Sequence, residues 1–251
     1  MVLSATADAA VLRAPGDPTE AVVWEEVKAR IEQDSRLTPT WLILMVVAVL
    51  IAGIGIITDS AVLIVGAMVV GPEYGPVASV AVGLHLNTWS WVRRGLLDLA
   101  VGFGVAVPAA GAMAWLLHQA DRLPDDFANG SNVATAFISR PDLFSVLVAA
   151  LAGVAGTLSL TLARSGTLVG VLISVTTVPA AAGIGAYAAE GRYEDAAGSL
   201  AQLLLNLILL AAVGALTLRV QRRVHLAHTR RTPAPIRPRA GARDPRDRRR
   251  S

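Results

Sequence analysis

The sequence predicts an all-α membrane protein in which six transmembrane helices form two inverted-topology repeats of three helices each. Three observations lead to this fold class. Hydrophobic residues make up 54% of the 251 residues and charged residues only 16%, which is more apolar than one soluble core of this size requires. Six apolar stretches are long enough to cross a bilayer. Helix-breaking residues recur near the middle of the second and fifth stretches, and paired broken helices are typical of inverted repeats.

Residues 1–37 are expected to form a cytoplasmic leader. Between residues 19 and 34, apolar residues fall at helical spacing with charged residues between them, which predicts a short amphipathic helix. Such a helix fits the membrane surface, and it fits equally well a cytoplasmic helix that packs on the protein. Because the first 40 residues are mostly polar, they do not resemble a cleaved signal peptide, and the first span is expected to stay in the protein.

The first span, residues 41–57, begins with two helix-start signals. Thr38 is suited to the N-cap, and Pro39 to the first helical position, where a missing N–H costs nothing. Trp41 stands where an interfacial aromatic anchor is expected.

The second span, residues 61–84, is interrupted near its middle by six residues. Two prolines four residues apart each remove a helical N–H donor, and two glycines let the backbone leave helical geometry, so a break is predicted. Lipid cannot satisfy the freed backbone groups, so the break should face the protein interior. A carboxylate at this depth is costly enough to indicate a functional site. The six residues are Gly71, Pro72, Glu73, Tyr74, Gly75 and Pro76.

The third and fourth spans are predicted over residues 95–117 and 143–163. Asp98 lies one turn beyond Arg94 in the third, and this spacing predicts an ion pair along the helix face. The fourth is rich in alanine and glycine, which permits close approach of neighbouring helices.

The fifth span, residues 166–188, repeats the theme of the second in weaker form. Thr176, Thr177 and Pro179 lie near its middle, and they predict a broken or kinked helix. The sixth span, residues 196–218, carries two amides, Gln202 and Asn206.

The two halves of the apolar chain, about residues 41–117 and 143–218, align at a constant shift of 104 residues. The shift brings the second break onto the first and Gln202 onto Asp98. Because the halves are offset by three crossings, they enter the membrane in opposite directions, which is the inverted-repeat arrangement. The alternative explanation is that alanine-rich spans resemble one another in general.

Residues 38–220 form the predicted transmembrane domain, and residues 221–251 form an arginine-rich tail that is expected to be disordered. Of the 22 basic residues, 12 are arginines between Arg219 and Arg250, on the same side as the arginines that follow spans two and four. The positive-inside rule therefore predicts both termini on the cytoplasmic side of the cell membrane. The tail is expected to contact anionic lipid, which already explains its charge without nucleic acid.

The sequence gives no indication of catalysis. It has no cysteine, and its four histidines lie at predicted span ends or in the tail, so no metal-binding cluster is predicted. Paired carboxylates and a Ser–His arrangement are also missing. We therefore expect no enzymatic activity and no bound metal or other cofactor.

Short motifs rich in glycine and proline run through both halves. They are Ile51-Ala52-Gly53-Ile54-Gly55, Val65-Gly66-Ala67-Met68-Val69-Val70-Gly71-Pro72, Gly75-Pro76, Pro141-Asp142, Ala152-Gly153-Val154-Ala155-Gly156, Gly170-Val171, Val178-Pro179 and Asn206. Over about residues 34–223 the chain resembles the DUF389 family of prokaryotic multi-pass membrane proteins, a domain of unknown function. The resemblance implies the fold and the membrane location but no activity. Where the family usually has an apolar pair between its prolines, this chain has Glu73 and Tyr74.

Two classes of function stay open. One is a transporter-like or channel-like protein for an ion or small solute with a midplane site at the broken helices, where Glu73 favours a cation or proton. The other is a non-transporting membrane scaffold or lipid-binding assembly, in which the breaks serve packing. A homo-oligomer is expected in either case. The candidate site residues are Glu73, Gly71, Pro72, Tyr74, Gly75, Pro76, Thr176, Thr177, Pro179, Gln202 and Asn206.

Overall fold

The computed structural model describes residues 31, 37–130, 138–161 and 167–229, and these residues form helices and turns without a strand. The all-α prediction is confirmed for them. The amphipathic helix predicted over residues 19–34 lies outside the described residues except for Ile31, which is buried in a cluster with Val82 and Leu218. Residues 230–251 of the predicted tail also lie outside them.

The chain divides into two compact units, of which the first ends at Arg219 and the second begins at Val220. The last helix, α10 (Tyr193–Thr229), runs through this boundary, so the first part of the predicted tail is helical. All contacts described below lie within the first unit.

The first hairpin forms where the sequence signals place it. Helix α3 (Pro39–Ile57) starts at Thr38, whose Oγ1 accepts a hydrogen bond from the Trp41 backbone N at 3.1 Å. Helix α4 (Ala61–Val70) starts at Ser60 and packs back against α3. The two helices meet closely at Gly55, where a Cβ atom would lie 2.8 Å from the Ile64 side chain.

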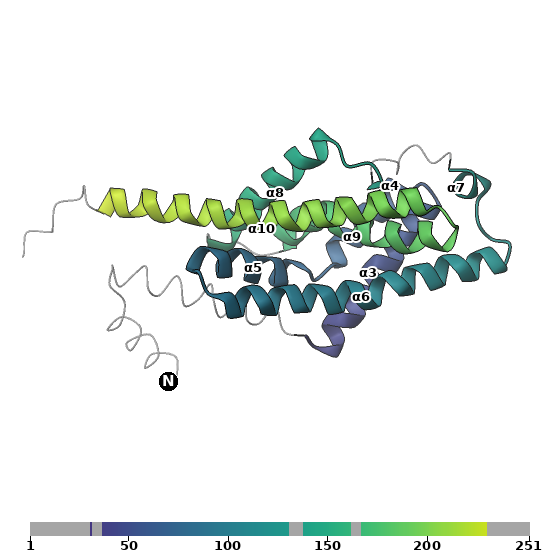
Figure 1. Cartoon of the computed structure of the whole chain (residues 1–251), viewed down its shortest axis with the longest axis horizontal. Coiled ribbons are helices and arrows are strands. Elements are labelled where there is room, and N and C mark those ends of the chain that lie inside the picture. The colour runs from purple at the N-terminus through teal and green to yellow at the C-terminus, as the bar shows by residue number, and fades with distance from the viewer. Residues whose placement is uncertain (1–30, 32–36, 131–137, 162–166, 230–251) are drawn as a thin grey trace, which may run out of the picture. The chain divides into compact units, whose positions relative to one another are not determined.

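The second predicted span is broken, as the sequence indicates. Helix α4 ends at Gly71, α5 (Tyr74–Leu86) begins three residues later, and the two are bent by 63°. Helix α5 ends at Asn87 in the left-handed conformation, and the chain returns as α6 (Trp89–Gln119) alongside it (Figure 1).

After α6, the described residues form a short helix and three long ones. They are α7 (Asp125–Ala128), α8 (Leu143–Thr161), α9 (Thr167–Ala189) and α10. Helix α9 is the centre of the first unit, because it contacts α3, α4, α5, α6 and α8, and its Gly183 lies against Ser199 of α10. Its residues 177–187 are buried except for Ile184, which is half-buried.

The sequence predicts a broken or kinked helix for the fifth span. Helix α9 is continuous through Pro179, so the break is wrong, and a kink at Pro179 stays a prediction. The physical reason is that Pro179 stands alone. It removes one N–H donor, whereas residues 71–76 combine two prolines with two glycines. Helices packed around a membrane helix also support the backbone at a single proline.

Four described helices are long and apolar enough to cross a membrane: Pro39–Ile57, Trp89–Gln119, Leu143–Leu160 and Tyr193–Arg223. The bent pair of α4 and α5 gives a fifth candidate if it counts as one span. Helix α9 occupies the residues of the predicted fifth span, and six crossings stay a prediction.

Candidate functional site

The broken helix places a carbonyl group without a helical donor inside the protein. In a regular helix the N–H of residue 76 would bond to the carbonyl of Pro72, but Pro76 has no N–H. The indole Nε1 of Trp41 donates to the Pro72 oxygen instead, at 3.1 Å. A side chain from α3 therefore satisfies the backbone at the break.

Trp41 is consequently not an exposed interfacial anchor. Its side chain is only 6% exposed, and its ring fills the space that a Cβ atom at Gly102 of α6 would take, 2.6 Å from Trp41 Cη2. Gly102 lies near the middle of α6. The break is thus level with the middle of α6 and with the start of α3.

Glu73 is the central residue of the candidate site. It occupies the N-cap position of α5, and its side chain is 0% exposed. The Thr177 hydroxyl, which is also fully buried, donates to Glu73 Oε1 at 2.9 Å. Thr177 therefore joins the Thr176–Pro179 stretch to the break, while the Thr176 side chain lies outside the described residues. Pro179, two residues further along α9 than Thr177, is also buried.

Gly71 makes room for the carboxylate. A Cβ atom at this position would collide with Glu73 Oε2 and would lie 2.9 Å from Val178 Cγ2. The missing side chain lets the Glu73 side chain fold back over the end of α4 towards α9. Gly71 and Pro72 are half-buried.

The remaining residues of the break pack the start of α5. Gly75 and Pro76 are buried, and a Cβ atom at Gly95 of α6 would lie 2.5 Å from the Pro76 carbonyl oxygen. Tyr74 is half-buried and lines a cavity between α5, α8 and α10.

That cavity has a volume of about 20 Å³ and an almost entirely apolar lining. A space of this size holds about one water molecule. It is too small for a solute, so it is not the binding site for one in this conformation. The lining residues are Tyr74, Val77, Ala78, Ala81, Val82, Gly153, Gly156, Thr157, Leu160, Leu210 and Leu218.

The two predicted amides of α10 lie together inside the protein. Gln202 is 3% exposed and Asn206 is fully buried, and Gln202 Nε2 donates to Asn206 Oδ1 at 3.4 Å. Ser199, which the sequence analysis did not single out, lies one turn earlier on the same face and is also fully buried. A serine in an apolar span is a weak sequence signal, because most such hydroxyls bond within their own helix.

The register of α9 and α10 sets the depth of these amides. The two helices are joined by a tight turn at residues 190–192 and run antiparallel, with Gly183 against Ser199. Asn206 is seven residues, or about 10 Å, beyond Ser199, and Thr176 is seven residues before Gly183. Asn206 is therefore at the depth of Thr176 and Thr177.

Asp98 of α6 is buried at 4% exposure, and it does not form the predicted ion pair with Arg94 in the described part of the chain. Arg94 is exposed and Asp98 is buried, so no direct ion pair forms between them, although the Arg94 charge still acts on the Asp98 carboxylate. Asp98 Oδ2 has no hydrogen-bond partner among the described residues.

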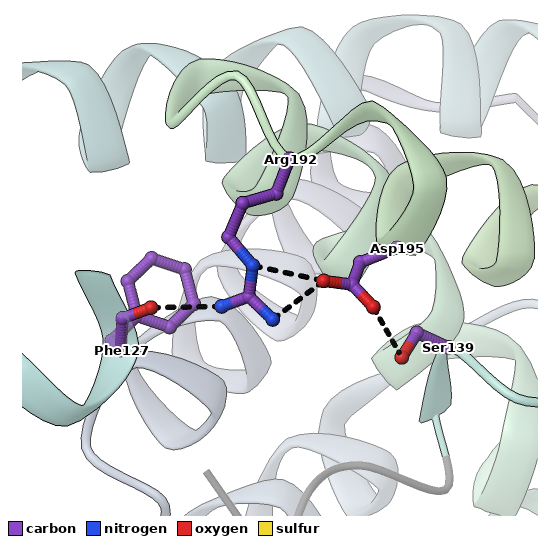
Figure 2. A network of polar contacts seen from close by, with 4 residues as sticks. All are labelled: Phe127, Ser139, Arg192 and Asp195. Carbon is purple, nitrogen blue, oxygen red and sulfur yellow. Dashed lines mark hydrogen bonds and ion pairs between the residues drawn. The ribbon is translucent and has the colours of Figure 1, made fainter. Parts of the chain in front are cut away.

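A second polar cluster lies where the chain turns from α9 into α10 (Figure 2). Arg192 Nε and Nη2 donate to Asp195 Oδ2 at 2.9 and 2.6 Å, and Arg192 Nη1 donates to the Phe127 carbonyl at 2.8 Å. The guanidinium also lies over the rings of Phe127 and Tyr187. Ser139 Oγ donates to Asp195 Oδ1 at 3.2 Å. The cluster ties the loop after α6 to the α9–α10 turn.

The described residues contain no group of three or more histidine, cysteine, aspartate or glutamate side chains placed to hold a metal ion.

Comparison with known proteins agrees with the resemblance seen in the motifs. Residues 68–212 match the family model described as "Domain of unknown function (DUF389)". The match covers more than half of the chain and includes the break, Thr177 and both amides of α10, but it begins after the glycine motif of the first span. Curated proteins and solved structures give no match.

Proposed function

The chain belongs to the DUF389 family, and from the geometry of the broken helix we propose that it is a transporter-like or channel-like membrane protein for a small cation or proton. The observation that carries the proposal is the Glu73 carboxyl group, fully buried in a helix break and hydrogen-bonded to Thr177 across the protein. A carboxyl group at membrane depth costs about 2.5 to 3.5 kcal/mol on insertion scales. A site that binds and releases a positive charge gives a reason for keeping it.

The proposal includes an inverted repeat as the framework of the site. Glu73 and Thr177, which bond to each other, are separated by 104 residues, the shift that aligns the two halves of the sequence. Gly95 and Ser199 have the same separation. Gly95 lies against Val80 of the preceding helix, and Ser199 lies against Gly183 of its own preceding helix. At the shift of 104 residues Val80 corresponds to Ile184, the neighbour of Gly183, so the two helix pairs pack within one residue of equivalent positions. This supports a repeat, and symmetric sites of this kind are typical of secondary transporters.

The proposal also includes six crossings, with α9 as the fifth, in the cell membrane with both termini cytoplasmic. Tags at either terminus should be protected in intact cells, and a tag inserted near Gly130 should be accessible. The opposite pattern would contradict the charge argument. We further propose contact of the arginine tail with anionic lipid and assembly as a homo-oligomer, for which crosslinking in native membranes is the test.

The experiment that tests the function is cation and proton flux in reconstituted vesicles, compared between the parent and Glu73→Gln. The amide keeps the size and can still accept from Thr177, so the variant should fold and lose cation or proton dependence. Asp98→Asn is a matched control, because it neutralises another buried carboxylate, on α6, that has no hydrogen bond to Glu73 or Thr177. Flux that is unchanged in Glu73→Gln would remove Glu73 from the mechanism.

One observation favours the alternative, a non-transporting scaffold or lipid-binding homo-oligomer. The cavity beside Tyr74 holds about one water molecule, and Glu73 is held by a hydrogen bond that a purely structural carboxyl would also make. Under this alternative no cation flux above that of empty vesicles is expected from the parent protein.

A further inference from the structure

One face of α10 carries polar side chains from the surface to the depth of the Glu73 site. Asp195, Ser199, Gln202 and Asn206 follow one another at intervals of four, three and four residues, which puts them on a single helix face. The eleven residue steps from Asp195 to Asn206 span about 16 Å along the axis. The next position on this face, Leu210, is apolar and buried, so the polar face ends at the depth of Thr177.

Two side chains of this face have buried oxygen atoms without partners. Ser199 Oγ and Gln202 Oε1 have no hydrogen-bond partner among the described residues, although Ser199 is 0% and Gln202 3% exposed. A buried polar atom without a partner is costly, and such atoms are rare in native proteins. Two such atoms, one helical turn apart on a face that starts at the surface, indicate a place where a polar ligand or an ion binds.

The spacing along this face indicates which kind of ligand binds there. Side chains three or four residues apart on a helix have Cβ atoms about 5 to 6 Å apart. Gln202 and Asn206 are long enough to bond directly, at 3.4 Å. The Asp195 oxygens already accept from Ser139 and Arg192, whereas Ser199 Oγ and Gln202 Oε1 need a water molecule or a partly hydrated cation as a bridge. Hydroxyl, amide and carboxylate oxygens are the ligands that hard cations prefer.

The charge around the outer end of the face suits a cation. The cluster of Figure 2 and the contact between His118 and Glu190 bring the loop after α6 to this end. Acidic side chains outnumber arginines there among the described residues, and an acidic surface raises the local concentration of cations. The acidic residues are Asp121, Asp125, Asp126, Asp142, Glu190, Glu194 and Asp195, and the arginines are Arg122, Arg140 and Arg192.

We infer that the polar face formed by Asp195, Ser199, Gln202 and Asn206 is a hydrated route by which a small monovalent cation, hydronium included, reaches Glu73 from the α9–α10 turn. The inference rests on the proposed function, and it adds the direction of access and two residues that receive the ion on its way. The Ser199 hydroxyl and the Gln202 carbonyl are these two groups.

The test uses the absence of cysteine from the chain. Single variants Ser199→Cys and Gln202→Cys are made in the full chain, together with two controls. Leu203→Cys is the depth-matched control, since Leu203 is the next residue after Gln202 and is buried among apolar side chains. Asn129→Cys, on the exposed loop, reports which side of the membrane the added reagent reaches.

The probe is Ag⁺, a small monovalent cation that binds thiolates, added to sealed vesicles from one side at a time. After the excess is removed, the protein is unfolded in detergent and its remaining thiols are labelled with a maleimide dye. We expect Ser199→Cys and Gln202→Cys to lose their labelling when Ag⁺ is added from the side at which Asn129→Cys loses it. Leu203→Cys should keep its labelling.

The inference is overturned if both variants keep their labelling as Leu203→Cys does, or if they lose it only from the side opposite to Asn129. Size-exclusion chromatography identifies a variant that fails to fold, and the other position then decides. This readout does not depend on flux. Reactive thiols together with unchanged flux in Glu73→Gln would refute the Glu73 site and leave the route, whereas protected thiols with altered flux would do the reverse.

Discussion

Replacing Trp41 by phenylalanine removes the only side-chain hydrogen bond that a described residue is seen to give to the Pro72 carbonyl. The ring stays apolar, but the donor at 3.1 Å from the Pro72 oxygen is lost. Because position 76 is a proline, the backbone cannot supply a substitute. Interhelical hydrogen bonds within membranes are worth about 0.6 kcal/mol on average and about 1.7 kcal/mol at most. We place the loss near the upper value, since the indole donor is buried and the backbone offers the acceptor no other donor.

The assay is thermal unfolding in detergent, monitored by size-exclusion chromatography. A chain of this size shifts its Tm by about 2 to 4 °C for each kcal/mol, so the variant should melt a few degrees below the parent. Trp89→Phe is the matched control, because Trp89 is 69% exposed. It should change the stability by less than about 0.5 kcal/mol.

A double variant separates the hydrogen bond from the packing of the ring against Gly102. Pro76→Ala returns an N–H to the position that bonds to the Pro72 carbonyl in a regular helix. Trp41→Phe should therefore cost less in the Pro76→Ala background than in the parent, as a double-mutant cycle would reveal. Equal stability of Trp41→Phe and Trp89→Phe, or strict additivity in the cycle, would refute the role assigned to the indole.

Three further outcomes are expected. Gly71→Ala should destabilise the protein by about 1 to 3 kcal/mol, because the new methyl group overlaps the Glu73 carboxylate and Val178. The measurement is thermal unfolding, and the control is Gly66→Ala, since the Cβ position of Gly66 has open space around it. The Asp142 carboxylate accepts hydrogen bonds from the Ser145 backbone N and hydroxyl, and these hold its pKa below the ordinary value. A carboxyl group whose pKa is lowered by folding stabilises the protein above its unfolded pKa, and this stability is lost as the pH falls through the folded pKa. Protection of the backbone amides at the start of α8 from hydrogen exchange should therefore fall on acidification in the parent and stay level in Asp142→Asn. A parallel fall in both would contradict the assignment. Arg192→Lys keeps the charge but loses the planar fork and the ring contacts; we expect a loss of about 1 to 2 kcal/mol and faster proteolysis near Gly130, neither of which should occur in the exposed control Arg122→Lys.

The break in the second span was predictable because its causes are local. Pro72 and Pro76 lack the N–H groups that a helix needs, and Gly71 and Gly75 tolerate the departure from helical geometry whatever surrounds them. The burial of Glu73 was predictable for a similar reason, since a lipid-facing carboxylate is costly in every membrane fold. The helix start at Thr38 and Pro39 also depends on neighbouring residues alone.

The constant shift of 104 residues also carried structural information. It paired Thr177 with Glu73 by position in the sequence, and the two side chains bond to each other in the structure. The alignment did not reveal the contact itself, because matching positions in two aligned halves of a sequence say nothing about which residues meet in the structure.

Only the tertiary structure decided the rest. Whether a lone proline such as Pro179 breaks a helix depends on the neighbours that surround α9, and the sequence does not list them. The same holds for Trp41, whose indole suits a membrane interface and a buried carbonyl equally well until the packing of α3 on the break is known. Ser199 and Gln202 became candidates for a route only when the structure showed them buried with oxygen atoms that lack a partner among the described residues. Local chemistry fixed where the backbone must change direction, and packing determined which distant side chains satisfy the groups that the change exposes.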